Sequence, residues 1–274
     1  LLNDIDLDGA AVSIPIFLGT FDGQNHRITG LALTGSASIC GFFSQIASGA
    51  VVRDLTVEGK VTPAGTQSRV GGIAGENYGS ISGCRFTGTV TGTDTVGLLA
   101  GYNGSSGLIE NSAADGVVHA TTSVGGIAGQ NYGSIRGCTS TAAVNTSVSD
   151  SELSTADLES SVYDLLKQQQ TTETGVNTDA GGIAGYSTGV IDSCTNEGSV
   201  GYPHVGYNVG GIVGRQDGLV TNCVNRGFVQ GRKDVGGIVG QMIPDITIQA
   251  GPDRVAQLRT ELSTLAELTE RTNN

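Results

Sequence analysis

Cysteines end a repeated phrase in this chain, and such a pattern raises the question of metal binding or disulfide chemistry. Residues 70–84 read VGGIAGENYGSISGC and residues 124–138 read VGGIAGQNYGSIRGC, with two differences. When all repeats are aligned, this position holds Leu55, Cys84, Ser112, Cys138, Cys194 and Cys223. A position that accepts Leu, Cys and Ser is typical of packing, because free cysteine behaves as a small hydrophobe. We therefore expect packing, with a disulfide between neighbours or a metal site as alternatives.

The histidines show no spacing that suits a metal or a catalytic centre. His26, His119 and His204 are the only three, and none has another histidine nearby. We expect solvated or corner positions for them. The sequence therefore predicts no catalytic residue, no cofactor and no metal site.

Charged residues recur in two further columns of the aligned repeats. One column holds Arg53, Ser82, Glu110, Arg136, Asp192 and Thr221, and the other holds Glu58, Thr87, Asp115, Thr141, Glu197 and Arg226. We interpret the first as exposed cross-strand pairs and the second as a solvated, mostly acidic face. The alternative is the cleft of a carbohydrate-active enzyme, which would need two or more carboxylates converging from adjacent coils.

Two segments that interrupt the repeats are candidates for ligand binding. The loop GSVGYPHVGYNVGG, residues 198–211, contains Tyr202, His204 and Tyr207, whose rings could stack on a sugar. The other candidate is the insertion at residues 145–179, since long insertions in repeat proteins map to one face and often carry binding. The alternative interpretations are corner packing for the loop and shielding of one face for the insertion.

The repeats themselves indicate the elements that must position these residues. Units that begin near VGGIAG recur at spacings of 26–29 residues, with one interval of 56 that contains the insertion. Within each unit, apolar columns alternate with glycine-containing turn phrases such as ENYGS, for which we expect a positive φ. Three short β-branched segments per unit describe one coil of a parallel β-solenoid, whose apolar face is buried only by stacking. The sequence thus predicts an all-β fold of about seven to eight coils.

Helical patterns appear only outside the repeats. Leu158, Val162 and Leu165 lie at helical spacing within the insertion 145–179. In the tail, Val255, Leu258 and Leu262 form an apolar stripe after Pro252. We expect a solenoid over residues 1–250 with an inserted helix, and a C-terminal helix over residues 251–274. That helix either caps the solenoid or begins a coiled coil with a helical partner.

Composition excludes several classes of partner. The 274 residues carry a formal net charge of −12 and contain no run of lysine and arginine, which argues against binding to nucleic acid. Apolar stretches fall short of the ~20 residues that a membrane helix needs. Glycine accounts for 44 residues, well above its usual share of roughly 7%, and tryptophan is absent. This composition suits a thin, repeatedly turning structure.

The phrase VGGIAGxNYGSI, followed by Cys84 or Cys138, resembles the GLUG repeat. So do the opening stretches FLGTFDGQNHRITGLAL and GFFSQIASGAVVRDLTVEG. The resemblance runs from about residue 3 to residue 243, interrupted at 145–179. GLUG repeats are similar to segments of bacterial surface proteins, including filamentous-haemagglutinin-like adhesins and non-catalytic regions of IgA1-specific metallopeptidases. The resemblance implies export and a right-handed parallel β-helix, but it supplies no ligand. The HExxH zinc motif of the metallopeptidases has no counterpart here.

Together these observations favour a non-enzymatic module of a secreted or cell-surface bacterial protein. We expect adhesin-like binding to a host glycan or extracellular protein, or service as a rigid stalk, without membrane insertion. The start LLNDIDLDG contains no signal peptide, so we expect the signal and any anchor to lie outside these residues. The alternatives are a β-helix lyase or glycosidase, and a spacer domain of a larger secreted peptidase.

Overall fold

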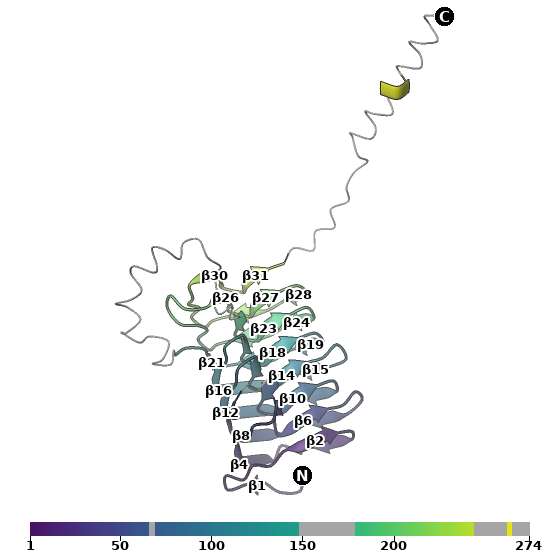
Figure 1. Ribbon diagram of the computed structural model, residues 1–274. Helices are drawn as coiled ribbons and strands as arrows, with labels where there is room; N and C mark the ends of the chain where they lie inside the picture. Colours follow the sequence, from purple (N-terminus) through teal and green to yellow (C-terminus); the bar gives the residue numbers. More distant parts are fainter. Residues whose placement is uncertain (66–68, 148–178, 244–261, 265–274) are drawn as a thin grey trace, which may run out of the picture. The chain divides into compact units, whose positions relative to one another are not determined.

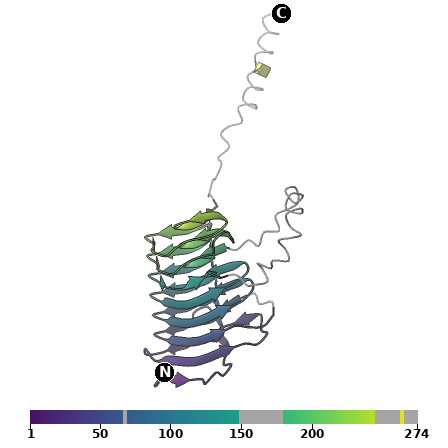
Figure 2. The same cartoon turned by 90° about the vertical axis from the view of Figure 1, so that its left-hand side faces the viewer.

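The computed structural model shows a parallel β-solenoid whose coils stack into a continuous rod (Figures 1 and 2). The structure describes residues 1–65, 69–147, 179–243 and 262–264. Leu1–Ile243 form one compact unit and Pro244–Asn274 form a second. All strand pairs within the four sheets are parallel, so the predicted fold class is confirmed. The right-handed winding stays a prediction.

Four sheets make up the walls of the solenoid, and each successive coil adds a strand to each of them. The chain visits them in the order D, B, C, A. Sheet D contains β5 (Ile39–Cys40), β9 (Arg69–Gly71), β13 (Thr95–Gly97), β17 (Ser123–Gly125), β22 (Asp179–Gly181), β26 (Tyr207–Gly210) and β30 (Lys233–Gly236). Sheet B contains β2 (Ile14–Phe17), β6 (Phe43–Ile46), β10 (Ala74–Asn77), β14 (Ala100–Asn103), β18 (Ala128–Asn131), β23 (Ala184–Ser187), β27 (Val213–Gln216) and β31 (Val239–Met242).

The other two walls follow the glycine-containing turn phrase. Sheet C contains β3 (Thr20–Asp22), β7 (Val51–Arg53), β11 (Ser80–Ser82), β15 (Leu108–Glu110), β19 (Ser134–Arg136), β24 (Val190–Asp192) and β28 (Leu219–Thr221). Sheet A contains β1 (Ile5–Asp6), β4 (Arg27–Leu33), β8 (Thr56–Val61), β12 (Arg85–Thr91), β16 (Ala113–His119), β20 (Thr139–Ser140), β21 (Ala143–Val144), β25 (Thr195–Asn196) and β29 (Val224–Asn225). The eight strands of sheet B agree with the predicted seven to eight coils.

Each regular coil therefore has four strands, whereas the sequence pattern predicted three. The difference arises because the glycine pair of VGGIAG bends the chain and divides the phrase between sheets D and B. At Gly71, an added Cβ would lie 2.1 Å from the carbonyl oxygen of Ala74, so only glycine allows this close backbone approach. The repeated phrase is a corner flanked by two strands, and the prediction had read it as a single strand.

The predicted apolar columns line the interior. Ile73, Leu99, Ile127, Ile183 and Ile212 are all fully buried, and so are Ile81, Ile109, Ile135 and Ile191 of the next column. Burial weakens at the last coil, where Ile238 is 40% exposed. At the diverged second coil, Phe43 pairs in register with Ala74, and so does not occupy the position equivalent to Ile73. The core is otherwise the one that the repeat alignment predicted.

The left-handed residues lie at a different corner from the turn phrase, where a positive φ was expected. At Gly79 of the turn phrase, glycine is needed because a Cβ would lie 2.3 Å from the carbonyl oxygen of Ala50. Gly59, Gly88 and Gly116 also share a repeat position, but they stack in register inside strands β8, β12 and β16 and form no corner. The left-handed corner instead precedes the cysteine column, at Asp54, Gly83, Asn111, Gly137, Ser193 and Asn222, with φ between 48° and 61°. Asp, Asn and Gly tolerate this conformation best.

Stacked amides run through the interior at the end of sheet B. Asn77 Nδ2 donates to Asn103 Oδ1 at 2.8 Å, and Asn103 Nδ2 donates to Asn131 Oδ1 at 2.8 Å. Asn131 Nδ2 continues the series to Ser187 Oγ at 3.1 Å. We call Asn77, Asn103, Asn131 and Ser187 the amide ladder. All four are fully buried, so their hydrogen bonds satisfy polar groups that water cannot reach.

The predicted helices fall largely outside the described residues. Residues 148–178 of the insertion lie outside them, and so does the predicted boundary at residues 250 and 251. In the second unit, Leu262, Ser263 and Thr264 are described, and they are helical. No helix within the described part of the chain is long and apolar enough to cross a bilayer.

Candidate functional site

The VGGIAG corner brings side chains seven residues apart to face one another outside the core. Gln130 Nε2 donates to Ser123 Oγ at 3.4 Å, and Arg69 pairs with Glu76. Strand register repeats this arrangement along the rod. We call the two series the facing columns: Arg69, Thr95, Ser123, Asp179, Asn208 and Asp234 from sheet D, and Glu76, Tyr102, Gln130, Tyr186, Arg215 and Gln241 from sheet B.

Aromatic rings pack along the sheet B side of this region. The ring centroids of Tyr78 and Tyr102 are 5.9 Å apart, those of Tyr102 and Tyr132 5.3 Å, and those of Tyr132 and Tyr186 6.0 Å. Gly104 makes room for the series, because a Cβ there would lie 2.4 Å from the Tyr78 ring. We call these four residues the tyrosine ladder. Centroid separations of 4.5–7 Å are those of favourable aromatic pairs.

Two arginines pack against rings of the tyrosine ladder. The Arg69 guanidinium lies 4.2 Å from the centroid of Tyr102, and the Arg215 guanidinium lies 4.4 Å from that of Tyr186. Each also pairs with a carboxylate that is at least nine-tenths buried, Glu76 for Arg69 and Asp179 for Arg215. An arginine held both by a ring face and by a carboxylate loses little further freedom when it binds a ligand.

A cleft of about 450 Å³ opens between the facing columns at the later coils. The cleft is lined by residues of strands β17, β18, β22, β26, β27, β30 and β31, and by the residue before β17. These residues are Thr122, Ser123, Gln130, Asp179, Tyr207, Asn208, Arg215, Lys233, Asp234 and Gln241. This volume falls within the range of about 300–1,000 Å³ that is usual for small-molecule sites. The cleft is therefore a concave candidate site.

Asp179 is the most strongly constrained group in the cleft. Its Oδ1 accepts a hydrogen bond from Asn208 Nδ2 at 2.7 Å, and its Oδ2 lies 3.0 Å from Arg215 Nη2. Burial raises the pKa of the Asp179 carboxyl above its ordinary value, and the hydrogen bond from Asn208 and the charge of Arg215 oppose this shift. Both carboxylate oxygens are thus engaged, and the group is well suited to orient its neighbours.

The predicted site residues divide into two groups. Tyr207 lines the cleft from β26, and the Arg232 guanidinium lies 5.7 Å from its ring centroid. Tyr202 and His204 do not line it. Tyr202 forms an antiparallel bridge with Val205, and His204 is exposed at a turn with φ of 62°. The structure therefore brings Tyr207 to the cleft but places Tyr202 and His204 on the preceding loop.

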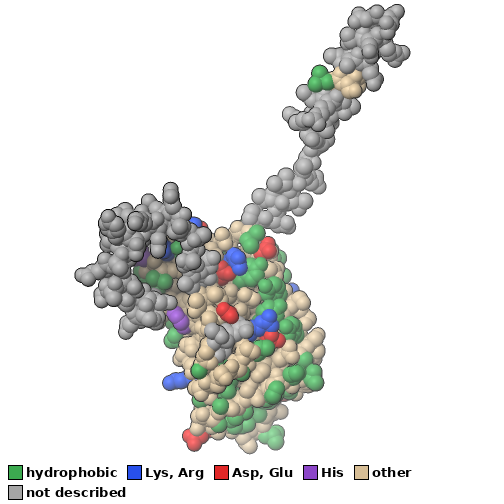
Figure 3. All heavy atoms as spheres, in the orientation of Figure 1, with side chains coloured by type: hydrophobic (Ala, Val, Ile, Leu, Met, Phe, Trp, Pro, Cys, Tyr) green, Lys and Arg blue, Asp and Glu red, His purple; other side chains and the backbone are tan. Residues whose placement is uncertain are grey.

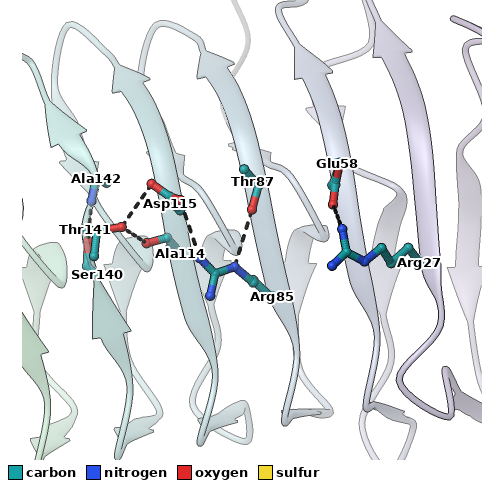
Figure 4. A network of polar contacts seen from close by, with 9 residues as sticks. All are labelled: Arg27, Glu58, Arg85, Thr87, Ala114, Asp115, Ser140, Thr141 and Ala142. Atoms are coloured by element: carbon teal, nitrogen blue, oxygen red, sulfur yellow. Dashed lines mark hydrogen bonds and ion pairs between the residues drawn. The ribbon is translucent and has the colours of Figure 1, made fainter.

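The two charged columns form surface contacts away from the cleft. Figure 4 shows the column on sheet A, where Arg27 pairs with Glu58 at 2.9 Å and Arg85 with Asp115 at 3.4 Å. These pairs are partly or largely exposed, and such pairs contribute about 0–1 kcal/mol. Figure 3 shows charges of both signs scattered over the face turned to the viewer.

The other charged column pairs differently from the prediction. Glu110 and Arg136 stand in register on neighbouring strands but form no ion pair among the described residues. Glu110 accepts a hydrogen bond from Ser82 at 3.2 Å, and Arg53 pairs with Asp22 at 2.6 Å. The expected alternation of charges is present in the register, and one cross-strand ion pair forms, between Arg53 and Asp22 of the preceding coil.

The cysteine column packs into the core. Cys84, Cys138 and Cys194 are buried, Cys223 is partly buried, and all five thiols of the chain are free. Burial raises the pKa of the Cys84 thiol to about 11, which keeps it protonated at neutral pH and makes it a poor nucleophile. In the described part of the chain, no three His, Cys, Asp or Glu side chains are placed to hold a metal ion. The packing interpretation is confirmed by this burial.

Cys138→Val tests the packing role of this column. We expect the free energy of unfolding to change by less than about 1 kcal/mol, because valine is apolar and only modestly larger than cysteine, and the thiol donates only weakly. Urea denaturation of the two proteins measures the difference. A loss of several kcal/mol, together with loss of a bound metal found by elemental analysis, would contradict the packing role.

The facing columns were missed at the sequence level because their members differ in type from coil to coil. Glu76, Tyr102, Gln130 and Tyr186 share a place in the repeat but no common chemistry. The available signal was the constant spacing of seven residues across VGGIAG. That signal becomes meaningful only once the glycine pair is known to bend the chain.

Comparison with known proteins agrees with the repeat assignment. Residues 66–91 and 120–145 match the family described as the GLUG motif. A region of 100 residues is 35% identical to halomucin from Haloquadratum walsbyi, covering 36% of this chain and 1% of that protein. The chain thus matches only a very small part of its relative's length. No solved structure matches.

Proposed function

We propose that this chain, which carries the GLUG motif in at least two of its coils, is a non-enzymatic cell-surface module that contacts extracellular ligands. The observation that carries the proposal is the pair of facing columns, which present tyrosine, arginine and amide side chains along one strip of a rigid rod. Because each coil is hydrogen-bonded to the next, the side chains on this strip keep fixed spacings. A fixed, repetitive face is suited to an extended ligand such as a glycan chain.

The GLUG motif and the similarity of 100 residues to halomucin support this proposed location at the cell surface. The elongated solenoid supports a role as a spacer as well as a binding face. Adhesin-like contact with a host glycan or an extracellular protein is the specific form that we propose. Secretion of the whole protein by a bacterium belongs to the same proposal.

An array of immobilised glycans and extracellular-matrix proteins tests the proposal. We expect saturable binding of this chain to at least one glycan class, and we expect Arg69→Ala or Tyr102→Ala to weaken binding to an extended glycan. An array without any bound glycan or protein would contradict the adhesive role and would leave the chain as a stalk.

A chain that lacks most of the insertion tests whether the solenoid folds without it. Removal of residues 148–177 leaves five residue steps from Val144 to Asp179, the same spacing as from Val118 to Ser123. We expect the shortened protein to keep its far-ultraviolet circular dichroism spectrum and its thermal transition, because β21 and β22 keep a link of ordinary length. Loss of the spectrum would show that the insertion is needed for folding of the solenoid.

One observation favours a second candidate function, a carbohydrate-active enzyme. Asp179 and Asp234 both line the cleft from coils two apart, which is about 10 Å along the rod and near the upper limit for an inverting glycosidase. The contacts of Asp179 favour binding, because neither carboxylate oxygen is free to give or take a proton. Release of reducing ends from a polysaccharide panel, abolished by Asp234→Asn, would support the enzyme.

A further inference from the structure

We propose that the cleft between the facing columns is a binding site for one neutral saccharide unit. This inference rests on the proposed function, since it assigns a ligand class and a location to the glycan contact. The ligand chemistry follows from the groups that line the cleft. The lining offers hydroxyls from Thr122, Ser123 and Tyr207, and amides from Gln130, Asn208 and Gln241.

The balance of charge selects a neutral ligand. The charged groups of the cleft are Asp179 and Asp234 against Arg215 and Lys233, so the formal charges cancel. An anionic ligand would meet the buried carboxylate of Asp179, and a cationic ligand would meet Arg215 and Lys233. An apolar ligand would leave these polar groups without water, at a cost of about 1–3 kcal/mol for each unpaired group. A polyhydroxylated ring both donates and accepts, as this lining requires.

The polar groups are held in place before any ligand arrives. Arg215 is fixed by the 3.0 Å contact with Asp179 and by the Tyr186 ring. Asn208 is fixed by its 2.7 Å hydrogen bond to Asp179. Such preorganisation lowers the entropic cost of binding. The Arg215 Nε is buried and lacks a hydrogen-bond partner among the described residues, so a ligand oxygen that reached it would satisfy this donor.

Tyr207 borders the cleft from β26, and the surface that the cleft exposes is mostly polar. The Tyr207 hydroxyl lies among amide and guanidinium groups that could bind the hydroxyls of a sugar. Lys233 is in register with Tyr207 on the next coil, so both border the cleft on the sheet D side. The cleft therefore offers the hydrogen-bonding groups that a polyhydroxylated ligand needs.

Saturation-transfer-difference NMR on the full chain tests the inference. The probes are galactose, glucose, N-acetylglucosamine and lactose as neutral sugars, with N-acetylneuraminic acid and inorganic phosphate as anionic controls. We expect transfer to at least one neutral sugar and none to the anions. Tyr207→Ala and Gln241→Ala should each raise the Kd at least fivefold, whereas Tyr78→Ala, a tyrosine outside the cleft, should leave it within twofold.

Circular dichroism melting of each variant shows whether it is folded, and Gln241→Ala provides a small, partly solvent-facing change that keeps the test valid if Tyr207→Ala unfolds. Transfer to no neutral sugar, or equal binding by the cleft variants and the parent, would overturn the inference. If the parent and cleft variants bind the glycan array equally, the proposed function survives without this site. If a neutral sugar binds the cleft while the array stays blank, the site stands and the adhesive role fails.

Discussion

Gly126→Ala is expected to destabilise the solenoid by more than about 3 kcal/mol. An added Cβ at Gly126 would lie 2.2 Å from the carbonyl oxygen of Gly182 on the next coil and 2.1 Å from Ser140 Oγ. The serine side chain can turn away, but the backbone carbonyl is held in the corner of the neighbouring coil. Relief would therefore require separating two coils that share several hydrogen bonds. Urea denaturation followed by circular dichroism measures the loss.

Gly237→Ala is the matched control for this substitution. Gly237 is the second glycine of the last VGGIVG phrase, and among the described residues no atom lies within 4 Å of an added Cβ there. We expect a change of less than about 0.5 kcal/mol. Equal effects at Gly126 and Gly237 would show that the phrase needs glycine for its own backbone conformation, and the stacking argument would then be wrong.

Asn103→Leu is expected to cost about 3 kcal/mol, because it removes the central member of the amide ladder. Leucine has a similar size but cannot donate to Asn131 Oδ1 or to the carbonyl oxygen of Gly107. Each buried acceptor left without a donor costs about 1–3 kcal/mol. The measurement is the midpoint and slope of urea denaturation, since a changed slope would reveal loss of cooperativity between coils.

Gln216 continues the column of the amide ladder, and for Gln216→Met we expect no loss of stability. Gln216 follows Ser187 in register and precedes Met242, and its side-chain amide is buried with neither Nε2 nor Oε1 hydrogen-bonded among the described residues. Replacing an unsatisfied amide by an apolar side chain of similar length should leave stability unchanged or raise it by about 1 kcal/mol. The ladder interpretation would be contradicted if Asn103→Leu cost less than Gln216→Met.

The tyrosine ladder and the amide ladder share one physical cause. Parallel stacking places equivalent residues about 4.8 Å apart, which suits ring-to-ring contact outside and amide-to-amide hydrogen bonds inside. Tyr102 and Asn103 are adjacent in β14 and point to opposite faces, so a single strand contributes to both ladders. Repetition of the phrase therefore builds the core and the candidate site together.

The repeat alignment by itself determined the parallel stack, the number of coils and the interior columns. Ile127 and Ile135 could be assigned to the core because the same residue type recurs at the same spacing in every unit, and burial requires that recurrence. The cysteine column could be interpreted in the same way, since Leu55 and Ser112 share its position. The left-handed corner before this column was also visible in principle, because only Asp, Gly, Asn and Ser occur there.

Only the tertiary structure decided where the candidate site lies. Asp179 and Arg215 are 36 residues apart, and nothing in either repeat unit signals that they form a pair. Their contact depends on the bend at the glycine pair, which sets the angle between sheets D and B, and on the stacking of one coil upon the next. A repeat pattern specifies which positions are equivalent along the rod. The angles at the corners decide which positions of neighbouring sheets face one another. Backbone contacts in three dimensions set these angles.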